Sequence, residues 1–154
     1  MQIKDDVEGW LGVFPALRSL ADEDFRLARS ALRFPTLAAG DVAYRQGWPC
    51  PNYVMCLEGQ TRGFKMSSTG REMLVYRVGG GGSCVLTTQC LLSGGTFPAE
   101  SVAEMPTRLA VLPADAFHRL MGQSPVFRAF VLDDYGRLLS SLFQLIDDVA
   151  FATL

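Results

Sequence analysis

The apolar and polar positions divide the chain into three zones. Residues 1–33 carry apolar side chains at intervals near three and four, which predicts helices with a break at Pro15. The acidic run at 22–24 favours a helix start because carboxylates stabilise helix N-termini. Residues 34–113 change to short strand-like segments, and residues 114–154 return to a helical period. We therefore predict one domain with a helical lead-in, a β-rich middle and closing helices.

Five segments of the middle zone have the length and composition of strands. They are residues 53–57, 61–65, 72–77, 99–103 and 108–112. Turn residues, mainly Gly, Pro and Ser, separate them about every 8 to 12 residues, a spacing typical of antiparallel β proteins. The pattern predicts a small antiparallel sandwich or roll.

The stretch 125–152 predicts one long helix, with Ser124 as N-cap and Pro125 at the first helical position. One apolar set follows the alternating spacing of a coiled-coil seam: Val131, Tyr135, Leu138, Leu142, Leu145 and Val149. A second set lies on neighbouring faces: Phe127, Phe130, Leu139, Phe143 and Ile146. Both faces have to be buried, either within one subunit or one on the roll and one on a partner. We expect a homodimer that forms through this helix.

Size and charge narrow the class of protein. The 154 residues are 49% apolar, enough for one domain with a core. A net charge of −2 without a basic run argues against binding a nucleic acid backbone unaided. The apolar stretches are too short to span a membrane, and the first residues lead into no signal-peptide core. We expect a cytoplasmic protein without a membrane partner.

The four cysteines fit neither a zinc site nor a secreted scaffold. Cys50, Cys56, Cys84 and Cys90 show neither spacing, so we expect reduced thiols. A redox pair of Cys84 and Cys90, six residues apart, stays an alternative. It lacks a Lys, Arg or His nearby in the sequence to lower a thiol pKa.

A run of four glycines at 79–82 is the main candidate for a ligand site. Such a turn can aim several backbone N–H groups at one point and hold an anion. A phosphodiester would also require a guanidinium, yet residues 78–107 contain neither Lys nor Arg. Arg62, Arg71 or Arg77 would have to reach the loop from another strand.

The candidate ligand-binding residues mix small polar and apolar side chains, which suits a small, mostly apolar ligand. They are Gly81, Gly82, Ser83, Cys84, Val85, Leu86, Thr87 and Thr88. The alternative is that these side chains cap a short helix and fill the roll, so that the pocket is vestigial.

Five segments follow one another along the chain: residues 37–47, 53–59 and 70–72, the glycine loop, and residues 110–117. As an ordered set they resemble the amino-terminal sensor half of the Crp/Fnr family of bacterial transcription regulators. The resemblance implies a double-stranded β-helix, a jelly-roll-like roll of the cyclic-nucleotide-binding type, followed by the dimerisation helix. It also implies a winged helix-turn-helix after Leu154, through which the full-length protein would bind DNA.

The family's cyclic-nucleotide members carry Gly-Glu near the glycine loop, for the ribose, and a later arginine for the cyclic phosphate. Here Ser83 follows Gly82, and residues 94–99 contain no basic side chain. We therefore do not expect cAMP or cGMP binding. Haem would depend on the single histidine, His118, and an iron–sulfur cluster on cysteines that are absent before Cys50. We predict no cofactor and no metal, and the effector is unknown.

Nothing in the sequence combines a nucleophile, a base and an orienting group, so we predict no enzymatic activity. The acid pairs at 133–134 and 147–148 are interpreted as a solvated helix face. The prediction is an effector-sensing and dimerisation domain of a Crp/Fnr-type regulator. A stand-alone ligand-binding or protein-interaction module with the same roll is the alternative.

Overall fold

The computed structural model describes residues 2–152. Its helices are α1 (Gln2–Val13), the 3-10 helix η1 (Pro15–Ser19), α2 (Asp22–Ala31), α3 (Val85–Ser93), α4 (Ala114–Gln123) and α5 (Pro125–Ala152). Its strands are β1 (Thr36–Leu37), β2 (Val42–Tyr44), β3 (Asn52–Glu58), β4 (Gln60–Met66), β5 (Glu72–Gly79), β6 (Glu100–Ala103) and β7 (Thr107–Pro113). The expected mainly β roll followed by a long C-terminal helix is confirmed.

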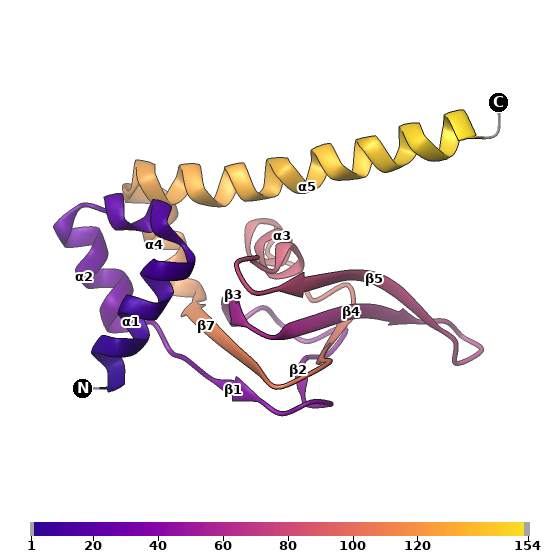
Figure 1. Ribbon diagram of the computed structural model, residues 1–154, viewed down its shortest axis with the longest axis horizontal. Coiled ribbons are helices and arrows are strands. Elements are labelled where there is room, and N and C mark those ends of the chain that lie inside the picture. Colours follow the sequence, from indigo (N-terminus) through magenta and orange to yellow (C-terminus); the bar gives the residue numbers. More distant parts are fainter. Residues whose placement is uncertain (1, 153–154) are drawn as a thin grey trace.

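The strands form two antiparallel sheets, in the orders β1-β7-β3 and β2-β6-β4-β5 (Figure 1). The five predicted strands are all present. β1 and β2 have only two and three residues, too few for an alternating pattern to reveal them. Inside the roll, the rings of Tyr44 and Phe97 stack with centroids 4.0 Å apart and pack with Cys84. Side chains therefore fill the interior of the roll.

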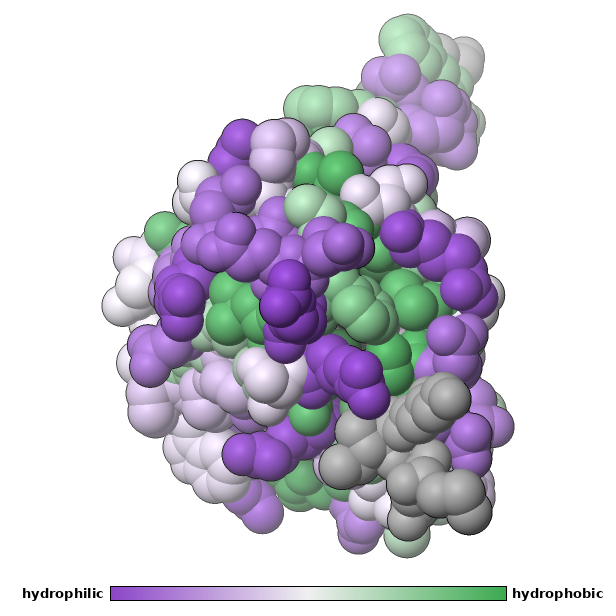
Figure 2. All heavy atoms as spheres, turned by 90° about the vertical axis from the view of Figure 1, so that its left-hand side faces the viewer, coloured by the Kyte–Doolittle hydropathy of each residue, from purple (hydrophilic) through white to green (hydrophobic). Residues whose placement is uncertain are grey.

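The helices α1, α2 and α4 gather at one end of the roll and close a second apolar core (Figure 1). Trp10 and Leu17 are buried there, and the ring of Tyr53 lies 5.0 Å from Phe117 and 6.0 Å from Phe127. Figure 2 shows this end from outside, with hydrophilic residues over most of the face and the far end of α5 projecting above the body. The core fixes where α5 starts.

The start of α5 follows the sequence prediction, because the backbone N–H of Phe127 donates to Oγ of Ser124 over 3.0 Å. Only Phe127 and Val131 of this helix are fully buried, whereas residues 139–152 are all exposed. Val131, the first residue of the predicted dimer seam, is 1% exposed and packs in the core of its own subunit. The part of the seam that is free to meet a partner therefore begins at Tyr135.

Candidate functional site

The glycine run leaves the end of β5 and returns along β3. The N–H of Gly81 donates to the carbonyl of Cys56, and the N–H of Cys56 donates to the carbonyl of Gly82, both over 2.9 Å. The N–H of Cys84 donates to the carbonyl of Val54 over 2.8 Å. Gly81 has a φ of 89°, which a residue with a Cβ adopts only with strain. The glycines thus serve to lay the loop directly against β3.

The loop does not form the expected cradle of free N–H groups. Besides the donors of Gly81 and Cys84, the N–H of Gly82 donates to the carbonyl of Gly79 over 3.0 Å. The N–H of Val85, at the start of α3, donates to the hydroxyl of Tyr76 over 2.6 Å. An incoming anion would have to break these internal bonds, so the sequence interpretation was wrong for these donors.

A carboxylate from α5 lies where the loop meets that helix. The buried hydroxyl of Ser83 donates to the carboxylate of Asp134, whose side chain is 21% exposed. Arg137 lies 3.6 Å from the other carboxylate oxygen. The expectation that Asp134 belongs to a solvated helix face was therefore wrong. The helix turns this carboxylate toward the roll, while the adjacent Asp133 is exposed.

The hydroxyl of Tyr53 is buried close to this contact without a hydrogen-bond partner within the described residues. Burial raises the pKa of Tyr53, the nearby Ser83 hydroxyl lowers it in part, and the charge of Asp134 raises it further. An unsatisfied buried hydroxyl has a free energy cost, and it marks the junction of roll and α5 as polar and incompletely paired.

A groove of about 240 Å³ runs between β5, the glycine loop and α5. Its lining includes Ser83, Asp134 and two arginines, Arg77 and Arg137. The sequence expectation of a recess without positive side chains was thus wrong, because the second arginine arrives from α5. Both are already paired, Arg77 with Glu104 over 2.7 Å and Arg137 with Asp134. A phosphate would have to compete with these carboxylates.

The other arginines considered from the sequence are placed away from this groove or engaged elsewhere. Arg62 forms an ion pair of 2.8 Å with Glu72, and Arg71 is exposed in the turn before β5. Neither lines the groove.

The remaining candidate residues divide between the groove and the interior. Gly82, Ser83 and Val85 line the groove, and Gly81 lines a neighbouring cavity of about 220 Å³ on the side of η1. Thr87 and Thr88 are buried, and both hydroxyls donate to the carbonyl of Cys84.

Leu86 and Cys84 belong to the cluster inside the roll, where Sγ of Cys84 is 3.2 Å from the hydroxyl of Tyr44. Cys84 and residues 86–88 thus help to fill the roll, as in the second alternative, but no side chain of the described residues caps the N-terminus of α3.

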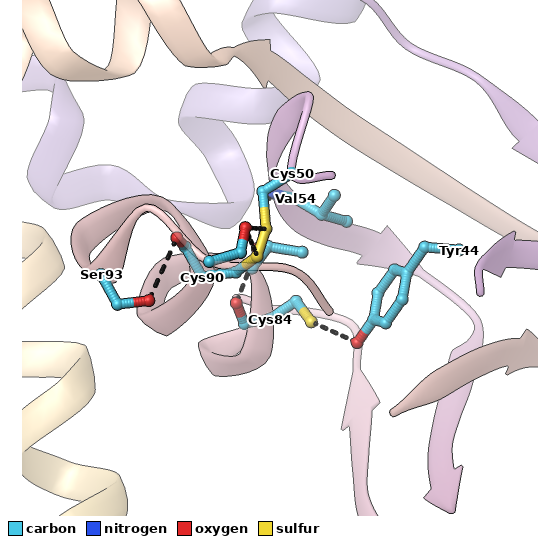
Figure 3. Close-up of a disulfide and its surroundings, with 8 residues drawn as sticks. Tyr44, Cys50, Val54, Cys84, Cys90 and Ser93 are labelled. Atoms are coloured by element: carbon cyan, nitrogen blue, oxygen red, sulfur yellow. Dashed lines mark hydrogen bonds between the residues drawn. A yellow bond between two sulfur atoms is a disulfide. The ribbon is translucent and has the colours of Figure 1, made fainter. Parts of the chain in front are cut away.

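The cysteines differ from the expectation of four reduced thiols. Cys50 and Cys90 form a disulfide, whereas Cys56 and Cys84 are free and buried. Figure 3 shows Cys50 joined to Cys90 on α3, with the Cys84 thiol turned toward Tyr44. The alternative pair of Cys84 and Cys90 is therefore also wrong. The true partner, 40 residues away, has no local signal in the sequence.

Two further searches cover the described residues only. Among them, no three His, Cys, Asp or Glu side chains are grouped so that they could hold a metal ion. None of the helices between residues 2 and 152 is both long enough and apolar enough to cross a membrane.

Comparisons with known proteins agree with this geometry. The fold is similar to a structure from Eubacterium rectale assigned to a transcriptional regulator of the Crp/Fnr family (TM-score 0.78, 22% identity, 91% of this chain and 65% of that one). It is also similar to the Catabolite Activator Protein of Thermus thermophilus (TM-score 0.70, 23% identity, 89% and 63%). A third similar structure is the sensor domain of the transcriptional regulator DNR from Pseudomonas aeruginosa (TM-score 0.69, 15% identity, 95% and 94%).

The chain thus spans less than two thirds of the length of the first two structures, and at these identities the likeness shows the fold. No curated protein sequence gives a significant match. The family model described as cyclic nucleotide-binding domain matches residues 35–124, more than half of the chain. The protein therefore belongs to the cyclic nucleotide-binding domain family, in the fold that Crp/Fnr-type regulators share.

Proposed function

We propose that the chain is the effector-sensing and dimerisation part of a Crp/Fnr-type transcription regulator. One observation carries the proposal. The first half of α5 is attached to the glycine loop through Ser83 and Asp134, and its second half projects from the roll with apolar side chains exposed. A ligand in the groove would alter the contact between Ser83 and Asp134, and thereby the direction of the second half of α5.

Exposed apolar side chains support dimerisation through α5. Leu142, Leu145 and Val149 of the seam are 45%, 57% and 63% exposed, a cost in free energy that a second copy of the helix would remove. Met73 and Leu74 on β5 are exposed as well. The roll would then support a seam that is short for an isolated coiled coil.

Light scattering tests the dimer. Leu142→Glu places a charge in the centre of the seam and should give a monomer at concentrations where the parent chain is a dimer. Ser140→Glu adds the same charge to the same helix at an exposed position outside the seam, and should leave the mass unchanged. An unaltered mass for Leu142→Glu would refute dimerisation through this seam.

The groove beside Ser83 is the proposed effector site. Its volume and its mixture of Val85, Leu138 and a few polar groups suit a small, mostly apolar molecule. Asp134 and the paired arginines disfavour a cyclic phosphodiester, because an anion would face a carboxylate and arginines that already have partners.

A thermal-shift series separates the two ligand classes. cAMP and cGMP should leave the melting temperature unchanged, while ligands that fill the groove should raise it by mass action. A clear rise with cAMP that Arg137→Gln abolishes would show that the arginine releases Asp134 and binds the phosphate, contrary to this proposal.

The remaining parts of the proposal follow the resemblance and the composition. DNA binding would belong to a module that follows this chain in the full-length protein, the location would be cytoplasmic, and the domain would catalyse no reaction. A stand-alone module that binds a ligand or a protein partner is the second candidate, favoured by the complete core of the domain. The coding sequence after Leu154 distinguishes them, since a helix-turn-helix signature supports the regulator.

A further inference from the structure

We propose that the Cys50–Cys90 disulfide is a reversible redox site that controls how firmly α3 is held on the roll. Cys50 lies in the connection between β2 and β3, and Cys90 lies in the last turn of α3. Their Cα atoms are 6.1 Å apart, within the range of ordinary disulfides. The bond joins the far end of the helix to a loop from another part of the chain (Figure 3). The site is separate from the effector groove, and the proposal does not require an effector.

The two sulfurs differ in access to solvent. A surface cavity of about 220 Å³ lies at the bond and is lined by both cysteines and by His118. Cys50 is partly exposed, whereas Cys90 is 1% exposed. An external thiol therefore reaches Sγ of Cys50 first. By contrast, the free thiols of Cys56 and Cys84 are both buried, which reserves the exchange reaction for this pair.

The surroundings also accommodate the reduced form. The carbonyl oxygen of Gly95 lies 3.6 Å from Sγ of Cys50 and 3.5 Å from Sγ of Cys90, so it can accept a hydrogen bond from either thiol. His118, which is exposed, is the basic side chain that the sequence lacked near these cysteines. A cationic side chain in this cavity would stabilise a Cys50 thiolate, and therefore the reduced form relative to the disulfide.

Opening proceeds by thiol–disulfide exchange. An external thiolate attacks Sγ of Cys50 and forms a mixed disulfide, while the bond to Cys90 breaks and Cys90 takes the electron pair and a proton. A second external thiolate attacks the external sulfur of the mixed disulfide and releases Cys50, which is protonated in turn. Two external thiols are thereby oxidised to one disulfide, and the protein disulfide is reduced to two thiols. A low-molecular-weight disulfide such as oxidised glutathione closes the bond by the reverse steps.

Opening the bond removes the covalent attachment at one end of α3. The other end continues directly from Ser83, which holds Asp134 of α5, and α3 also packs against α5. A looser α3 should therefore transmit the redox state toward the dimerisation helix. The effect requires no other contact than those already described.

Thiol counting on the native chain tests the chemistry. Untreated protein, alkylated with iodoacetamide in denaturant, should show two thiols, and native protein treated first with dithiothreitol should show all four. The far-UV circular dichroism should stay the same, and oxidised glutathione should return the count to two. The proposal would be overturned if the count stays at four thiols after treatment with oxidised glutathione. It would also be overturned if the bond opens only when the whole chain unfolds.

Hydrogen exchange tests the consequence. Amide exchange in residues 85–93 should become about fivefold faster or more when the parent chain is reduced, and also in the variant Cys50→Ser. The reason is that the disulfide no longer restricts local opening of α3. Cys56→Ser removes a buried thiol outside the disulfide and is the matched control, with the exchange in α3 unchanged. Equal exchange in α3 before and after reduction would refute the coupling, even if the bond itself is reducible.

Discussion

The contact between Ser83 and Asp134 should stabilise the attachment of α5 to the roll by an amount that a double-mutant cycle can measure. The hydroxyl is buried and the carboxylate is 21% exposed, so the pair is largely removed from water. Hydrogen bonds to charged groups contribute about 1.5–3 kcal/mol, and the partial exposure of Asp134 places this one near the lower end. We expect a coupling free energy of about 1.5 kcal/mol between Ser83→Ala and Asp134→Ala.

Urea unfolding at a fixed protein concentration is the assay, with the parent, both single variants and the double variant. In a parallel thermal unfolding experiment, the same 1.5 kcal/mol would correspond to a shift of roughly 5 °C in melting temperature, since the unfolding entropy is about 2.1 cal/mol/K per residue. Asp133→Ala is the control, because this neighbouring carboxylate is exposed and makes no hydrogen bond to Ser83. A coupling free energy below about 0.5 kcal/mol between Ser83 and Asp134 would refute the reasoning. So would a coupling of equal size between Ser83 and Asp133.

Three further predictions concern single residues. Ser124→Ala removes the N-cap of α5 and should cost about 1 kcal/mol, seen as a lower urea midpoint. Gly59→Ala should destabilise the chain far more than Gly70→Ala, by about 3 kcal/mol against about 1 kcal/mol. Both glycines have a positive φ, but only the Cβ at position 59 would meet a backbone carbonyl oxygen, at 2.5 Å. Burial raises the pKa of the Cys56 thiol to about 11. The fold thus favours its protonated form, and this stabilisation is present below about pH 9 and lost as the pH approaches 11. The urea midpoint of the parent should fall across that window more than that of Cys56→Ala, and a parallel fall in both would contradict the assignment.

Much of the fold was predictable because its signals are local. The acids at 22–24 begin α2, and Ser124 with Pro125 begins α5, since capping depends on neighbours within one turn. The five predicted strands are short segments set apart by turns that contain glycine, proline or serine. The exception among the helices is α3, whose mixture of threonines and cysteines carries little helical periodicity. It forms because its buried face completes the filling of the roll.

The candidate site was less predictable because its deciding contacts join distant positions. Ser83 and Asp134 are 51 residues apart, and Cys50 and Cys90 are 40 apart. A local pattern of glycines suggests free N–H donors, but only the fold shows that β3 and Tyr76 have already accepted them. The prediction of a recess without positive side chains failed for the same reason, since Arg137 reaches the groove from α5, far away in the sequence.

The two long-range links meet on one short helix, and their energetic coupling has to be reciprocal. α3 begins two residues after Ser83 and carries Cys90 in its last turn, so it is held at both ends. If reduction of the disulfide changes the affinity of a ligand in the groove by some factor, the same ligand must change the reduction equilibrium by that factor. Once a ligand is found, its dissociation constant in oxidised and reduced protein, and the glutathione ratio at half-reduction with and without it, provide two independent measurements of one free energy. A factor of one in both measurements would mean that ligand and disulfide do not act on the same states of α3.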